Sequence, residues 1–140
     1  MALIAIAETA QDVGCALSKF LDPVADASAE ITSLIAECFS TSSALRKLAN
    51  AIGDFPNPRR HVVVAGDVQT VKDSLRFTFS DVQRIVGGLA RYPVISAASY
   101  RQAWRELDAH FQQQSNNTLT RRLKLYQLFI EGLRSILIEG

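Results

Sequence analysis

Residues 31–52 read ITSLIAECFSTSSALRKLANAI, and their apolar positions recur at alternating steps of three and four. The register is Ile31, Leu34, Cys38, Thr41, Leu45, Leu48 and Ile52. Such steps place one stripe along a single side of an α-helix, where it packs against neighbouring helices. The stretch therefore predicts a long amphipathic helix in a helical fold.

Two later segments have the same spacing. The first has Val64, Val68, Val71, Leu75, Thr78, Val82, Ile85 and Leu89, and the second has Leu119, Leu123, Tyr126, Ile130, Leu133 and Leu137. Leu125, Leu128, Phe129 and Ile136 widen the face of the second segment, which is typical of a helix with contacts on two sides. Repeated stripes joined by short turns predict an all-α antiparallel bundle of four to five helices.

The limits of the first two helices follow from local signals. We expect a first helix over residues 2–20. Asp22-Pro23 offers a cap and a proline for the first turn of the second helix. Gly53 and the prolines at 56 and 58 end that helix.

Local signals also predict where the third, fourth and fifth helices begin and end. The third helix is expected to begin between His61 and Asp67, and Arg91-Tyr92-Pro93 closes it. Ser96 caps a fourth helix, and the polar residues 112–117 form the turn before the fifth. The chain thus reads as one domain over residues 1–140, either alone or as the N-terminal module of a longer protein.

Composition and net charge argue against several classes of protein. An apolar content of 48% is enough for one core, and a formal charge of +1 argues against a basic nucleic-acid binder. The apolar N-terminal run has no preceding basic residue and is cut short by Glu8, so we predict no signal peptide. A membrane-spanning helix needs about 20 predominantly apolar residues. The sequence contains no stretch of that length without charged residues. A cytoplasmic location is expected.

Two cysteines are too few for a disulfide framework, and both are predicted to be buried and reduced. If the first two helices fold back around Asp22-Pro23, Cys15 lies near residue 30 and Cys38 near residue 7. At 1.5 Å per residue the two sulfurs would then be roughly 12 Å apart, beyond disulfide reach. This spacing favours a reducing compartment.

Catalytic and metal-binding patterns are missing from the sequence. It has no glycine-rich phosphate loop, no nucleophile elbow and no zinc-protease helix. His61 and His110 lack a second ligand at metal spacing, and Arg76 and Arg84 each follow an aspartate by three residues, as in exposed ion pairs. We predict a protein that is not an enzyme and that uses no cofactor or metal.

Three groups of residues are candidates for binding. Basic residues could hold a phosphate or an anionic lipid, with a solvated face as the plainer alternative; they are Arg59, Arg60, Arg121, Arg122 and Lys124. An apolar N-terminal segment, Leu3, Ile4 and Ile6, either packs in the core or leaves it for a membrane. An aromatic stripe, Tyr100, Trp104 and Phe111, either packs in the core or lines a pocket for a hydrophobic ligand.

The order of these features resembles the HeLo-like helical domains at the N-termini of fungal NLR-type signalling proteins. The similarity comes from an apolar N-terminal helix, a tryptophan helix, and the runs at residues 29–37, 43–48, 67–72 and 119–126. It implies a helical signalling module with homotypic assembly and, in some members, membrane damage during regulated cell death.

The sequence therefore predicts a non-enzymatic protein-interaction or signalling domain in a fungal cytosol. Its partner is another protein or a second copy, and nucleic acid is not expected. Two alternatives stay open. One is a membrane-targeting effector that inserts its N-terminal helix at an anionic surface. The other is a small accessory protein that binds a hydrophobic ligand beside Trp104.

Overall fold

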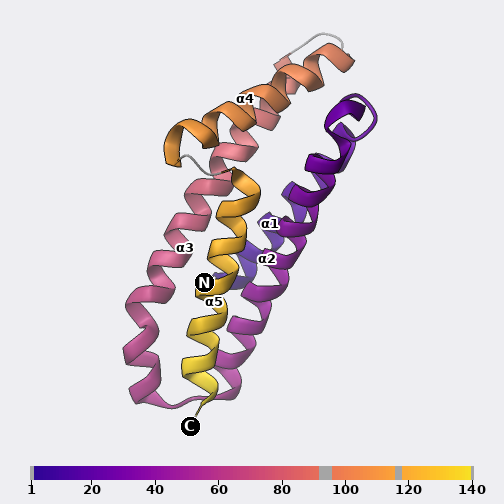
Figure 1. The fold of residues 1–140 in the computed structure, drawn as a ribbon. Coiled ribbons are helices and arrows are strands. Elements are labelled where there is room, and N and C mark those ends of the chain that lie inside the picture. The colour runs from indigo at the N-terminus through magenta and orange to yellow at the C-terminus, as the bar shows by residue number, and fades with distance from the viewer. Residues whose placement is uncertain (1, 92–95, 116–117, 140) are drawn as a thin grey trace.

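The computed structural model describes residues 2–91, 96–115 and 118–139, which form helices and no strand. The five α-helices are α1 (Leu3–Leu17), α2 (Ser28–Asp54), α3 (Pro58–Gly87), α4 (Ala97–Ser115) and α5 (Leu119–Ile138) (Figure 1). The predicted all-α bundle is confirmed.

Four of the helices form the body of the bundle. α1 packs against α2 and α3, and α5 packs against the same two helices from the other side. α1 and α3 run in one direction while α2 and α5 return in the other, and α4 lies obliquely across one end (Figure 1). The chain therefore builds a four-helix body with one helix over its end.

The three apolar stripes of α2, α3 and α5 meet in one core. Nearly all of their predicted positions are buried, and Ile52, Val68 and Tyr126 are half-buried at its edge. Phe20, Phe79 and Phe111 are the largest side chains that are fully buried. Each contributes roughly 1.5–3 kcal/mol through removal of apolar surface from water.

The second helix begins later than predicted. Residues 18–27 contain two short 3₁₀ helices, Ser18–Phe20 and Ala25–Ala27, before α2 starts at Ser28. Phe20 and Val24 are buried, and the Val24 N–H donates to the Phe20 carbonyl at 2.9 Å. Burial of these two residues overrides the helix-start signal at Asp22-Pro23.

The third helix begins earlier than predicted, at Pro58. The Arg59 backbone N–H donates to Asn57 Oδ1 at 3.1 Å, so Asn57 caps the helix. Pro58 is then the first helical residue, where its missing N–H costs no hydrogen bond. The start predicted between His61 and Asp67 is wrong because the Asn57 cap and Pro58 begin the helix before His61.

The fourth helix is longer than predicted. It continues through residues 112–115, which were expected in a turn, and ends at Ser115. The Gln112 side-chain amide donates to Asp108 Oδ2 at 3.3 Å, one helical turn back. Asn116 and Asn117 of the expected turn, and Tyr92 and Pro93 of the expected closure of the third helix, lie outside the described residues.

The cysteine predictions need correction. Cys38 is buried, but Cys15 is exposed. A Cβ placed on Gly14 would lie 3.3 Å from the Cys38 Cβ, so Cys38 lies level with Gly14 and not with residue 7. The predicted register is wrong because the turn between α1 and α2 is centred beyond Asp22-Pro23.

The two thiols should differ sharply in reactivity. Burial, with a smaller effect from the charge of Glu37, raises the pKa of the Cys38 thiol to about 12. Cys38 therefore stays protonated and shielded at neutral pH, whereas Cys15 is accessible. An Ellman titration of the native chain should count one fast thiol, and the count should rise to two in denaturant. Cys15→Ser should remove the fast thiol, and a native Cys15→Ser chain that still reacts fast would contradict this burial.

Candidate interaction surface

The N-terminal segment is largely part of the core. Leu3 and Ile6 are buried among the core residues, and only Ile4 is exposed. Together with Ala7 and Ala10, which are completely buried, they hold α1 against its neighbours. Release of this segment into a membrane would therefore expose apolar core surface.

The basic residues do not form one patch. Arg59 and Arg60 begin α3, whereas Arg121, Arg122 and Lys124 lie in the first turns of α5 at the other end of the body. Arg60 Nη1 donates to the Ile136 carbonyl at 2.8 Å. Ile136 and Arg122 are 14 residues apart on α5, or about 20 Å. The five basic residues that the sequence offered as a site for an anionic partner therefore lie in two separate groups.

Two members of the basic group at α5 have partners within the chain. The Arg122 guanidinium lies over the Phe111 ring, 5.2 Å from its centroid. Lys124 Nζ is 3.9 Å from Glu37 Oε2 on α2. Arg121 is exposed.

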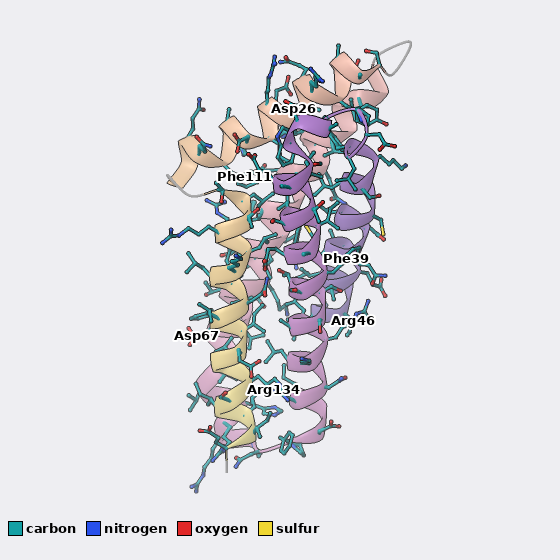
Figure 2. The ribbon with its side chains drawn as sticks, turned by 45° about the vertical axis from the view of Figure 1, so that its right-hand side comes forward. Asp26, Phe39, Arg46, Asp67, Phe111 and Arg134 are labelled. Carbon is teal, nitrogen blue, oxygen red and sulfur yellow. The ribbon has the colours of Figure 1, made fainter. Side chains whose placement is uncertain are left out.

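The aromatic stripe is divided between core and surface. Phe111 is fully buried where α4 meets α5 (Figure 2). Tyr100 is half-buried and meets the Phe20 ring edge-on at 5.0 Å. Trp104 alone of the three lines a cleft, of about 260 Å³, between α2, α4 and α5. Pockets for drug-sized ligands occupy about 300–1,000 Å³, so this cleft is small for the ligand that the sequence suggested.

The two histidines serve structural contacts. His110 Nε2 lies 3.0 Å from Asp81 Oδ2, which ties α4 to α3. His61 Nε2 lies 2.9 Å from the Phe55 carbonyl, at the turn between α2 and α3. No cluster of three or more His, Cys, Asp or Glu side chains suited to a metal occurs in the described part of the chain.

The predicted ion pairs on α3 are confirmed. Arg76 Nη1 is 4.0 Å from Asp73 Oδ1, and Arg84 Nη2 is 3.7 Å from Asp81 Oδ1. Both pairs are largely exposed and contribute little to stability. Asp73 and Asp81 are thus each paired with an arginine one turn away on the same helix.

A groove between α2 and α5 is lined by polar residues that include Glu37 and Gln127. The Gln127 side-chain amide lies 2.9 Å from Glu37 Oε1 and 3.2 Å from Thr41 Oγ1. Thr41 is completely buried and donates to the Glu37 carbonyl at 2.7 Å. The groove has a volume of about 620 Å³, and Leu128 and Lys47 stand on its walls. These hydrogen bonds hold α2 and α5 in a fixed relation beside the groove.

The outward side of α5 carries a second stripe. We define the outer stripe as Arg121, Leu125, Leu128, Gly132, Ser135 and Glu139, with Phe129 and Ile136 beside it. Its backbone steps are again four and three, on the side opposite the buried stripe. Leu128 is 71% exposed, and the other large apolar members are 43–50% exposed. α5 lies at the front of the body in Figure 1, and no described helix crosses in front of it.

The outer stripe was only partly foreseen. The sequence marked Leu125, Leu128, Phe129 and Ile136 as widening the face of the last helix, yet it did not select them as binding residues. The signal was present, because one helix cannot turn two opposite stripes to the same core. The structure shows which stripe is buried and which is exposed.

No family model matches this chain, and comparison with curated proteins and with solved structures finds no similar protein. Among the described helices, none has the length and apolar character needed to cross a membrane.

Proposed function

We propose that this protein is a non-catalytic protein-binding module that docks through the outer stripe of α5. The observation that carries the proposal is the exposure of Leu125, Leu128, Phe129 and Ile136 on one side of a helix. The opposite side of the same helix already fills the core through Leu123, Ile130 and Leu137. The exposed residues are therefore not needed to build the bundle.

A contiguous apolar strip of this kind favours a partner. Scattered exposed hydrophobic residues are normal, but a row along one helix is typical of an interaction site. Partners often bind by laying an apolar helix face against such a surface, with anchors at steps of three and four. The step pattern of the outer stripe fits this mode of recognition.

A signalling role of the HeLo-like type is part of the proposal and rests on the sequence resemblance. The fungal origin has the same basis, whereas the cytoplasmic location rests on the lack of a signal-peptide pattern in the sequence. The membrane effector is less favoured, because Leu3 and Ile6 are buried. The ligand-binding alternative is less favoured because only Trp104 of the predicted trio lines the small cleft.

Site-specific photo-crosslinking in cells that express the chain tests the docking surface. A photoreactive amino acid placed at Leu128 should give discrete adducts of higher mass. The matched control is Val62 on α3, which is 76% exposed but lies outside the outer stripe. Position 62 should give few adducts, and adding Phe129→Lys to the position-128 chain should remove its adducts. Equal adducts from both positions, or none from position 128, would overturn the proposal.

A further inference from the structure

We propose that the partner of the outer stripe is a second copy of this chain, paired through α5 in antiparallel orientation around a two-fold axis that crosses the outer stripe at the level of residue 130. This inference rests on the proposed docking function and names its partner. It follows from two pairs of positions along α5, Arg121 with Glu139 and Leu128 with Gly132.

The charged ends of the stripe match each other across such an axis. Arg121 and Glu139 each lie nine residues from Ile130, one before it and one after it. In an antiparallel pair, Arg121 of each copy therefore faces Glu139 of the other. The two-fold axis places this Arg121–Glu139 contact at both ends of the interface, because both copies contribute the same surface.

The same charges are placed unfavourably within a single chain. The N-terminus of a helix carries partial positive charge and favours acidic residues, while its C-terminus favours basic ones. α5 has no acidic residue in its first turn and no basic residue in its last. An antiparallel copy supplies the missing charge at each end and also opposes the two helix dipoles. The pairing thus offsets an unfavourable arrangement in the monomer.

The centre of the stripe allows close approach. Leu128 and Gly132 each lie two residues from Ile130, so Leu128 of one copy packs over Gly132 of the other. A Cβ placed on Gly132 would meet nothing within 4 Å in this chain, so the space above the glycine is open. Phe129 and Ile136 border this contact on the side of α5. A large residue thus meets an open glycine at the middle of the interface.

The small area that α5 can contribute to the interface predicts a weak dimer. A 20-residue helix is about 30 Å long and about 10 Å wide, which gives roughly 300 Å² per copy. Stable interfaces bury about 800 Å² per partner. We therefore expect association only at high protein concentration, with monomers at lower concentration.

Sedimentation equilibrium of the full chain over a concentration series tests the pairing. The mean mass should rise from 15.4 kDa toward twice that value. Leu128→Glu should weaken association by at least about tenfold, because a charged carboxylate would replace an apolar side chain and would lose water at the centre of the interface. Val62→Glu, a charge at an equally exposed site on α3, should leave association unchanged.

Charge reversal tests the antiparallel register. Arg121→Glu and Glu139→Arg should each weaken the dimer by about fivefold at low salt, since each places like charges together twice. The double variant Arg121→Glu/Glu139→Arg should restore wild-type association. Restoration requires each residue to meet the other across the axis, so weakening that adds up in the double variant would overturn this register.

The remaining outcomes separate this inference from the docking function. A wild-type chain that stays monomeric at about 1 mM overturns the self-pairing. Adducts from position 128 in cells with a mass other than that of a dimer would then still support docking of a different protein. A dimer that Leu128→Glu leaves intact would place the interface elsewhere and overturn the inference.

Discussion

Phe79→Ala should lower the free energy of unfolding by about 3–5 kcal/mol, the usual cost of removing a large aromatic side chain from a packed core. Phe79 is completely buried on α3, among residues of the central cluster. The loss combines the removed apolar contacts with the cavity left behind. Urea denaturation followed by circular dichroism measures the effect.

Phe77 provides a matched control on the same helix. It lies two residues from Phe79, has the same side chain and is 73% exposed. Phe77→Ala should change the free energy of unfolding by no more than about 0.5 kcal/mol. Similar losses from both substitutions would mean that α3 does not turn the face at Phe79 toward the core.

Gly14→Leu should destabilise the protein by about 1–3 kcal/mol through overpacking. α1 and α2 approach closely at this glycine, where a Cβ would lie 3.2 Å from Phe39 Cε1 and 3.3 Å from Cys38 Cβ. Phe39 is partly exposed and can give way a little, but a whole isobutyl group has no room between the helices. Thermal unfolding of the variant measures the cost.

Gly66→Leu should have the opposite effect. Gly66 lies within α3, and a Cβ there would meet nothing within 4 Å. Leucine in a helix is favoured over glycine by up to about 1 kcal/mol, so the variant should be slightly more stable than the wild type. If both glycine variants lost stability equally, the close contact between α1 and α2 would be contradicted.

The bundle was predictable from the sequence because the spacing of apolar residues within each helix is a local feature of the chain. The stripe through Leu34, Leu45 and Leu48 alternates by three and four, and this spacing alone decides which side of α2 is buried. Helix limits were less predictable. Pro23 looks like a helix start, but burial of Phe20 and Val24 depends on contacts from distant segments.

The binding surfaces were harder to predict for the same reason. Arg60 and Arg122 are basic in the sequence, yet only the packing of α3 against α5 reveals that they lie far apart. The exposure of Cys15 likewise depends on the register between α1 and α2, which the sequence placed wrongly. For α5 the sequence predicted two apolar sides, and packing decided which one faces solvent.

The most direct test of self-association through the outer stripe of α5 is an amide NMR dilution series on the isotope-labelled chain, from about 1 mM to about 10 µM. The account predicts that the largest concentration-dependent shifts fall on residues 121–139, centred on Leu128 and Gly132, while the residues of α1 stay unchanged. Spectra that are identical at every concentration, or shifts centred on Leu3 and Ile6, would contradict self-association through the outer stripe.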